Sequence, residues 1–409
     1  MGKDLNGKEL GRGITQRKDG RYMGRIHIKG SKKEITLYDR NLKVLKNKVS
    51  TYQALAGTSQ WDISMTVTEW FEQWMEIYNV PVLKATTIRN YWDGFKRVQP
   101  LIGDCRVIDI KSNNILSAIC VLKENGYAPA TIKQTFTILK VMFSMAYRVR
   151  AVLYNPCEGM RAPTERTHQE IIEREESQNL EKDVQRFLDV CRHTRYYELF
   201  YILSRTGLRI GEACALEWKD VDLERKCIYI DKTVNKVKKY YDSKGRKMES
   251  SKMVAQITSP KKQASYRIVP ISDETVNAFA AWKTKQLADK QRWGRKWGIK
   301  NELLKDFPDL IFTTSPGKTY LPGYATQECK RISDCINRRE KQMALSENRE
   351  SEFIHIHPHL FRYFYVTKCV EKGMNPVMIG KITGHAEIRM TQHYTRLSDE
   401  FILRQHEVH

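Results

Sequence analysis

Five large apolar residues between positions 67 and 77 recur at helical spacing, and this stripe constrains the fold more than any other feature. They occupy the i, i+3, i+4, i+7 and i+10 positions of one helix face and are Val67, Trp70, Phe71, Trp74 and Ile77. Further helices are predicted over residues 85–101, 112–125 and 129–149. Residues 64–160 are therefore predicted to form an all-α domain, with the aromatic residues of the stripe in its core.

Several donor side chains fall at the starts of these predicted helices. They are Lys84, Thr86, Thr87 and Arg89 at the second helix and Lys133 at the fourth. Helix N-termini and cationic side chains both bind phosphate oxygens, so this group is a candidate DNA-binding set.

A different pattern precedes the helical segment. Short runs with β character span residues 13–16, 21–28 and 34–38, and a helix is predicted over residues 42–55. Asp19-Gly20 between the first two runs is typical of a tight hairpin turn. Residues 1–60 are therefore predicted to form a small three-stranded sheet with one helix.

This N-terminal segment is also strongly basic. It holds 14 Lys or Arg residues against 5 Asp or Glu residues. A basic ribbon of this kind suits a DNA groove, with Arg17, Lys18, Arg21 and Arg25 as candidate contacts. The alternative interpretation is a solvated basic tail.

A polar stretch over residues 161–178 is predicted to link the helical segment to a third domain, residues 170–409. That domain is mixed and mainly helical. Its predicted elements are helices over residues 181–192, 196–206 and 211–217, strands over 227–230, 253–257 and 267–269, and further helices beyond. The fold class is thus multidomain: a small β plus helix unit, an all-α unit and a mainly-α unit with a small sheet.

The overall charge indicates a polyanionic partner. The chain of 409 residues carries a formal net charge of +22. Nucleic acid is the favoured partner, because neutralising phosphates releases condensed counterions, and a membrane surface is the alternative. Nine cysteines without a Cys-x-x-Cys pair, and no apolar run of bilayer length, predict a cytoplasmic, nucleoid-associated protein with no membrane segment.

One cation lies at a predicted helix junction. In Thr-Gly207-Leu-Arg209-Ile-Gly-Glu212, Gly207 is expected to end one helix, and Glu212 lies in the first turn of the next. The guanidinium of Arg209 would then present a planar fork to two phosphate oxygens. A purely local pair between Arg209 and Glu212 is the alternative.

A second group of chemistry-bearing residues lies near the end of the chain. His359 and Arg362 share one helix face by their spacing, and Asn375-Pro376 and Gly384 mark a helix that delivers His385. Tyr394 follows as a candidate nucleophile. Two alternatives concern neighbouring residues. One is a zinc site formed by His355, His357 and His359. The other is Tyr363 or Tyr365 as the nucleophile, although both are predicted to pack in a helix beginning at Arg362.

With these residues in this order, the chain resembles the tyrosine recombinases, which include phage and conjugative-transposon integrases. The resemblance covers about residues 64–409 and rests on Gly207-Leu-Arg209-x-x-Glu212, His359-x-x-Arg362, Thr383-Gly384-His385 and Tyr394. The run Ser259-Pro-Lys261-Lys262-Gln-Ala-Ser265-Tyr-Arg267-Ile-Val-Pro270 matches the family's catalytic-lysine region. It implies Lys261 as the catalytic lysine, with Lys262 as its rival.

The chain departs from the family pattern at two positions and carries one additional segment. Tyr363 and Thr383 stand where members usually have His and Leu, and neither replaces a charged catalytic group. Residues 234–252 look like an insertion before the lysine, and a basic finger toward DNA is one interpretation. The N-terminal segment is also similar to the arm-binding domain of conjugative-transposon integrases.

The resemblance implies a site-specific recombinase with helical core-binding and catalytic domains. Tyr394 would form a 3′-phosphotyrosyl link without metal or other cofactor, and Arg209, Arg362, His385, Lys261 and His359 would assist. The expected partners are double-stranded DNA, three further copies in a homotetramer, an excisionase-type protein and host DNA-bending proteins. Two other functions stay open: a type IB topoisomerase that only relaxes DNA, and a non-catalytic DNA-binding accessory protein.

Overall fold

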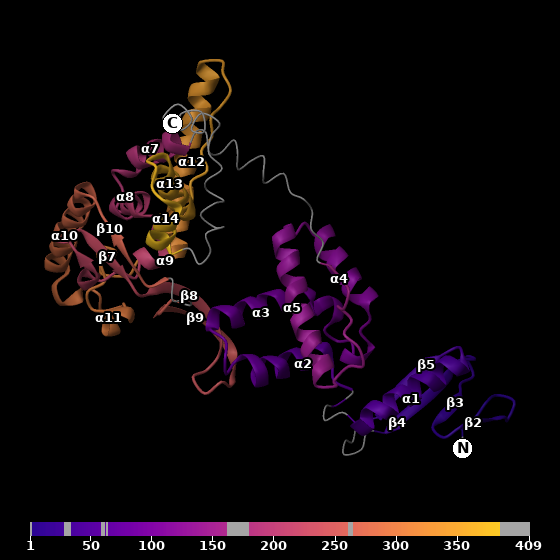
Figure 1. Ribbon diagram of the computed structural model, residues 1–409. Coiled ribbons are helices and arrows are strands. Elements are labelled where there is room, and N and C mark those ends of the chain that lie inside the picture. Colours follow the sequence, from indigo (N-terminus) through magenta and orange to yellow (C-terminus); the bar gives the residue numbers. More distant parts are fainter. Residues whose placement is uncertain are drawn as a thin grey trace. The chain divides into compact units, whose positions relative to one another are not determined.

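The computed structural model describes residues 2–27, 34–58, 62, 64–161, 180–260 and 265–384 (Figure 1). The chain divides into two compact units. The first comprises Met1–Arg166 together with Lys238–Lys252, and the second comprises Thr167–Val237 together with Met253–His409.

The N-terminal part of the first unit is the predicted sheet with its helix. An antiparallel sheet in the order β3-β4-β5 lies against α1, and a small two-stranded β1-β2 ladder that was not predicted precedes it. The elements are β1 (Gly2–Lys3), β2 (Glu9–Gly11), β3 (Ile14–Gln16), β4 (Tyr22–His27), β5 (Glu34–Asp39) and α1 (Leu42–Thr58). Alternate residues such as Ile26 and Leu37 are buried with Leu45 and Val49 of the helix, as a half-buried sheet requires.

Residues 67–148 of the first unit are mainly helical, as predicted. Its elements are α2 (Val67–Trp74), the π-helix η1 (Met75–Asn79), α3 (Ala85–Ile102), the 3₁₀ turn η2 (Val107–Asp109), α4 (Ser112–Glu124) and α5 (Pro129–Arg148). Phe71 lies at the centre of the core, where its ring stacks on Phe95 with ring centroids 3.9 Å apart. Aromatic burial of this kind contributes strongly to the stability of a helical domain.

The predicted stripe is wrong at its last member. Val67, Trp70, Phe71 and Trp74 are buried, but Ile77 is 52% exposed. The helix changes to the π form at Met75, where each turn takes more residues than in an α-helix, so the phase of the buried face shifts.

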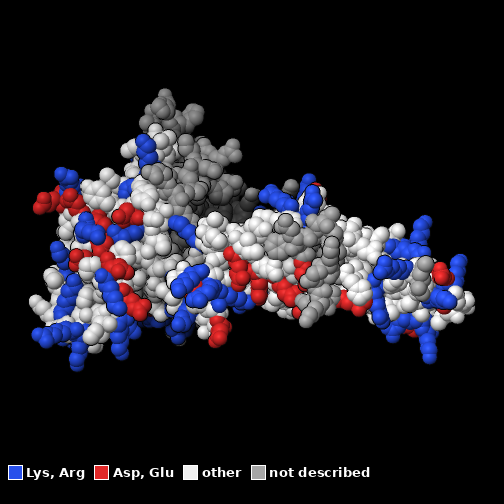
Figure 2. Space-filling view, turned by 90° about the horizontal axis from the view of Figure 1, so that it is seen from below, with Lys and Arg blue, Asp and Glu red and all other residues white. Residues whose placement is uncertain are grey.

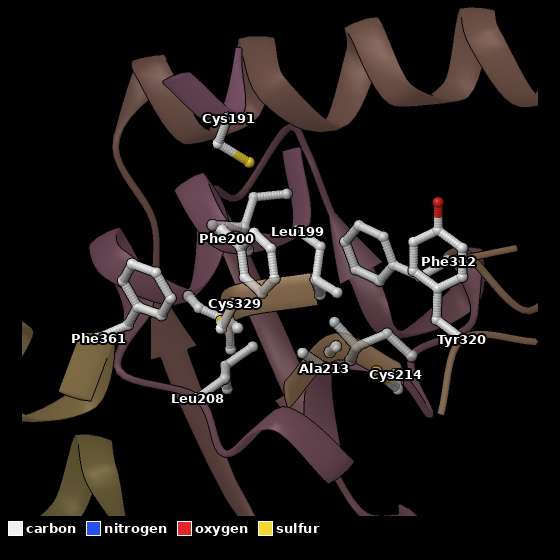
Figure 3. Packing of buried hydrophobic residues seen from close by; sticks show 14 of the residues in the cluster. Cys191, Leu199, Phe200, Leu208, Ala213, Cys214, Phe312, Tyr320, Cys329 and Phe361 are labelled. Carbon is white, nitrogen blue, oxygen red and sulfur yellow. The ribbon is translucent and has the colours of Figure 1, made fainter. Parts of the chain in front are cut away.

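The second unit is mixed and mainly helical. Its strands are β6 (Val221–Asp222), β7 (Cys227–Ile230) and β10 (Arg267–Pro270), in the antiparallel order β10-β7-β6. Its helices are α7 (Leu180–Cys191), α8 (Tyr197–Thr206), α9 (Ile210–Ala213), η3 (Trp218–Asp220), α10 (Asp273–Trp293), η5 (Gly294–Lys296), α11 (Leu303–Asp306), α12 (Pro322–Ser346), α13 (Pro358–Glu371) and α14 (Pro376–Thr383). Figure 3 shows Phe200 of α8 beside Phe361 of α13 in the core of this unit.

Two predicted helix boundaries in this unit are wrong. The helix predicted over residues 211–217 is only the four-residue α9, because the chain turns at Cys214 toward a short bridge between Glu217 and Leu310. The helix predicted to begin at Arg362 begins at Pro358, where the fixed φ of proline suits the first turn.

The predicted insertion is a two-stranded hairpin of β8 (Thr233–Tyr241) and β9 (Lys247–Thr258). Its distal half, residues 238–252, belongs to the first unit. Tyr240 stacks on Trp92 with ring centroids 5.1 Å apart, and the Lys247 ammonium lies 2.5 Å from the Glu72 carboxylate. The end of the hairpin is therefore fixed by aromatic packing in the helical core, while its use as a DNA-reaching finger stays a hypothesis.

Cationic side chains gather on part of the described surface. Figure 2 shows lysine and arginine densely covering the N-terminal sheet and helix. All nine cysteines are unpaired. Across the described ranges, none of the helices combines the length and apolar character needed to cross a membrane.

Candidate active site

The end of helix α8 places the first candidate cation. Gly207 ends the helix with φ at 62°, the left-handed conformation that the sequence predicted for this glycine, and its N–H donates to Leu203 O at 3.1 Å. The chain then reverses so that Arg209 immediately precedes α9. Arg209 is thereby held between two helix ends.

The Arg209 guanidinium makes both a local and a distant contact. Its Nη1 donates to Glu212 Oε1 at 2.8 Å, and its backbone N–H donates to Glu212 Oε2 at 2.9 Å. The local ion pair considered from the sequence is therefore present. Arg209 Nη2 also donates to Gly384 O at 3.1 Å, and the side chain keeps 39% of its surface exposed. The guanidinium is thus oriented at two points while still facing solvent.

Glu212 is shared with a second arginine that sequence reasoning left without a role. Arg267 of β10 donates from Nη1 and Nη2 to the two carboxylate oxygens at 3.0 and 2.7 Å. Burial alone would raise the pKa of Glu212, but the hydrogen bonds and charge of Arg267, with the charge of Arg209, outweigh it and lower the pKa. Glu212 is therefore a carboxylate anion at neutral pH.

Arg362 is the most deeply buried of these cations. It lies in α13 with 1% of its surface exposed, and it donates from Nη1 to Gly207 O at 2.8 Å and from Nη2 to Thr383 O at 2.6 Å. One guanidinium therefore connects the end of α8 with the end of α14.

His359 lies in the first turn of α13, three residues before Arg362, and is exposed. Desolvation by its surroundings, followed by the positive charges of Arg362, His357 and Arg209, lowers the pKa of His359. The imidazole is therefore neutral at pH 7, the form that accepts a proton.

Helix α14 has the terminal signals that the sequence predicted. The Asn375 side chain accepts from Val377 N at 2.8 Å, Pro376 occupies the first turn, and Gly384 ends the helix with φ at 68°. His385 follows directly and lies outside the described residues, as do Tyr394 and both candidate lysines, Lys261 and Lys262.

Three successive carbonyl groups at the end of α14 each accept from a different arginine. Ile382 O accepts from Arg267 Nε at 2.7 Å. Thr383 O accepts from Arg362 and Gly384 O from Arg209, as described above. The last carbonyls of a helix have no partner within the helix and carry partial negative charge, so cations suit them. The end of α14 therefore brings Arg209 and Arg362, far apart in sequence, to one place.

Two of the alternative roles considered for neighbouring residues, the zinc site and Tyr365 as nucleophile, find no support in the geometry. Within the described ranges, no three His, Cys, Asp or Glu side chains gather as metal ligands, so His355, His357 and His359 do not form such a cluster. Burial raises the pKa of Tyr365, whose ring packs against Gly207. A raised pKa disfavours the phenolate form that a nucleophile requires.

The candidate DNA contacts of the helical domain do not form one cluster. Lys84, Thr86, Thr87 and Arg89 all lie at the start of α3, where Arg89 pairs with Asp93 at 3.6 Å. Farther along α3, Arg97 donates to Thr135 of α5 at 3.3 Å, and Gly94 lies against Ile138. The two helices are therefore antiparallel where they pack. The exposed Lys133 precedes Thr135 in α5, so it lies toward the C-terminal end of α3, away from the start of that helix.

In the N-terminal sheet, the candidate contacts lie on the face away from α1. Arg25 points outward from β4 with 56% of its side chain exposed, because its neighbours Gly24 and Ile26 face the helix. The guanidinium groups of Arg17 and Arg21 lie 5.5 and 5.9 Å from the Tyr38 ring centroid. Lys18 is exposed in the turn between β3 and β4.

Two models of known protein families match this chain. Residues 179–400 match the model described as phage integrase family, and residues 66–119 match the phage integrase N-terminal SAM-like domain. The chain belongs to the phage integrase family. It is a tyrosine recombinase, as the resemblance implied.

Two known proteins are similar to this recombinase over most of its length. The transposase from transposon Tn916 of Enterococcus faecalis is 25% identical over 96% of this chain and 92% of its own length. A tyrosine recombinase XerC-like protein of Caldanaerobacter subterraneus subsp. tengcongensis is 25% identical over 80% of this chain and 78% of its own.

Solved structures show the same fold. The Tn1549 transposon integrase in complex with transposon right end DNA has a TM-score of 0.61 at 20% identity, covering 84% of this chain and 98% of that one. A lambda integrase tetramer bound to a Holliday junction has a TM-score of 0.53 at 16% identity, covering 96% of this chain and 98% of that one.

Gly207→Ala tests the geometry at the end of α8. A Cβ there would lie 2.5 Å from the Tyr365 ring, in a left-handed conformation that alanine rarely adopts. We expect a loss of about 1–3 kcal/mol in the free energy of unfolding beyond that of Gly373→Ala. Gly373 is a matched control in the same unit, with φ at 74° and no atom within 4 Å of the added Cβ. Urea denaturation followed by circular dichroism measures both, and equal losses would contradict the clash.

Proposed function

We propose that this recombinase cleaves and rejoins double-stranded DNA at the ends of a mobile element, through a 3′-phosphotyrosyl link at Tyr394. The observation that carries the proposal is the convergence of Arg209 and Arg362 on the end of α14, one residue before His385. A phosphodiester carries negative charge and is a poor electrophile, so pre-oriented cations are what its cleavage demands.

Each residue has one role in the proposed step. The phenolic oxygen of Tyr394 bonds to the scissile phosphorus while the bond to the 5′ oxygen breaks. His359 accepts the phenolic proton, and Lys261, with Lys262 as its rival, protonates the departing 5′ oxygen. Arg209 and Arg362 neutralise the charge on the non-bridging oxygens, and His385 donates a hydrogen bond to one of them. The step requires no metal or other cofactor.

The comparisons support the substrate class and the partners. The Tn916 transposase and the Tn1549 integrase are named for transposons, and the latter was solved with DNA from a transposon end. The lambda integrase tetramer on a Holliday junction supports a homotetramer on DNA. An excisionase-type protein and host DNA-bending proteins complete the proposed set of partners, in a cytoplasmic, nucleoid-associated location.

The proposed domain division adds two DNA-binding regions to the catalytic domain of residues 170–409. Residues 1–60 would bind DNA away from the exchange point through Arg17, Lys18, Arg21 and Arg25. Residues 64–160 would hold the DNA near the cleaved bond, with Lys84, Thr86, Thr87, Arg89 and Lys133 as phosphate contacts. The exposure of Arg25 and Lys133 supports this use.

Tyr394→Phe is the direct test of the nucleophile. On a suicide substrate that traps the covalent adduct, we expect wild type to form the adduct and Tyr394→Phe to form none, because the attacking oxygen is gone. Tyr365→Phe is the matched control and should keep the adduct, since its ring still packs against Gly207. An adduct with Tyr394→Phe would show that another residue attacks.

A second assay, with two separate sites on supercoiled DNA, separates recombination from DNA relaxation. Joining of two separate sites by wild type is the expected result. Relaxation of supercoils without such joining would instead assign a topoisomerase activity.

The pH dependence of cleavage tests the proton acceptor. Because the pKa of His359 lies below its ordinary value of 6.5, the neutral base persists to lower pH. We therefore expect the midpoint of the acidic limb of the single-turnover cleavage rate to lie below pH 6.5. His359→Gln should remove this acidic limb. A limb above pH 6.5, or one unchanged in the variant, would reject His359 as the base.

Arg25→Ala tests the N-terminal contact face. If Arg25 contacts one phosphate, its loss should reduce the slope of log binding constant against log salt concentration by about 0.9. The full chain bound to DNA from the element's ends is the system to measure. Lys43→Ala, an exposed position on α1, is the control and should leave the slope unchanged. Equal slopes for wild type and Arg25→Ala would exclude the contact.

A further inference from the structure

Arg267 lies among the proposed catalytic residues, although the proposed chemistry gives it no step. Its side chain, from the edge strand β10 of the second unit's sheet, is 4% exposed. It donates to both oxygens of Glu212 and to the carbonyl oxygens of Ser265 and Ile382, the last two at 3.2 and 2.7 Å. A buried guanidinium with four such contacts has a fixed position.

The first consequence concerns the charge of Arg209. Glu212 is 4% exposed and accepts from both arginines, so the two cations share one carboxylate. Without Arg267, the full negative charge of Glu212 would act on Arg209 alone. With Arg267 present, the three groups together keep one positive charge, and Arg209 is the member that faces solvent. Arg267 therefore preserves the attraction of Arg209 for a phosphate.

The second consequence concerns geometry. Arg267 Nε binds Ile382 O, and the next two carbonyls bind Arg362 and Arg209. Arg267 thus fixes the end of α14 relative to Glu212, which in turn orients Arg209. Lysine has one nitrogen and no planar fork, so it would not hold both the carboxylate and the carbonyl in this arrangement.

We propose that Arg267 is a positioning residue for DNA strand cleavage, which aligns Arg209 and the end of α14 against the scissile phosphate. It does not itself contact the phosphate. This inference rests on the proposed function, because it concerns the same cleavage step.

Arg267→Lys keeps the charge and removes the fork, which makes it the test variant. A misplacement of about 1 Å costs about 100-fold in rate, so we expect about that loss in single-turnover cleavage of the suicide substrate by the full chain. Arg195→Lys is the matched control: Arg195 pairs with Asp289 in the same unit, away from α14, and its variant should cleave like wild type.

A neutral scissile group distinguishes positioning from general stability. A methylphosphonate at the cleaved position carries no charge for Arg209 to neutralise, so the loss caused by Arg267→Lys should shrink on this substrate. The ratio of the rates on the two substrates does not depend on the folded fraction of the variant. Combining Arg209→Ala with Arg267→Lys should cost less than the sum of the single losses, because Arg267 acts through Arg209.

The outcomes separate the inference from the proposed function. An adduct with wild type but an unchanged rate in Arg267→Lys would overturn the role of Arg267 alone. An equal loss on phosphate and methylphosphonate would also overturn it, because only folding would then be affected. No adduct with wild type would overturn the proposed function, and the role of Arg267 with it.

Discussion

The end of helix α14 is the point on which the arrangement of the site depends. Its last carbonyls carry partial negative charge and lack partners within the helix, and Arg267, Arg362 and Arg209 satisfy three in succession. These arginines come from β10, from α13 and from the turn between α8 and α9. A feature of backbone chemistry, the orphan carbonyls of a helix, thus gathers cations that lie up to 175 residues from their acceptors in the sequence.

The local parts of this arrangement could be predicted from sequence. Gly207 and Gly384 were expected to end helices because glycine adopts the left-handed conformation without strain, and both do so. Asn375 and Pro376 were expected to start α14 for equally local reasons. The role of Arg267 could not be foreseen, because its partners are a carboxylate 55 residues earlier and a carbonyl 115 residues later. The sequence placed Arg267 in the run that matches the family's catalytic-lysine region and in a short apolar strand, but neither signal names its partners.

The fold, like the site, could be predicted where local sequence signals determine it and not where long-range contacts do. The amphipathic helices of the first unit follow from a period of about 3.6 residues, which sequence displays directly. Ile77 was misassigned because one π-helical turn shifts the period without any marker residue. The hairpin was read as a charged insertion, but Tyr240 and Tyr241 are buried among the helices of the first unit. Only the tertiary contact distinguishes such tyrosines from surface ones.

The three arginines differ in solvent exposure, and therefore in whether they can contact a phosphate. Arg362 and Arg267 are almost fully buried, whereas Arg209 keeps more than a third of its side chain in contact with solvent. Burying a charge is costly unless it is paired and hydrogen-bonded, and removing one partner of a buried pair costs about 3–5 kcal/mol. The network around Glu212 and α14 therefore resists rearrangement. A cation held in this way needs no reorganisation when a phosphate arrives, and such preorganisation is how fixed charges stabilise a transition state more than water does.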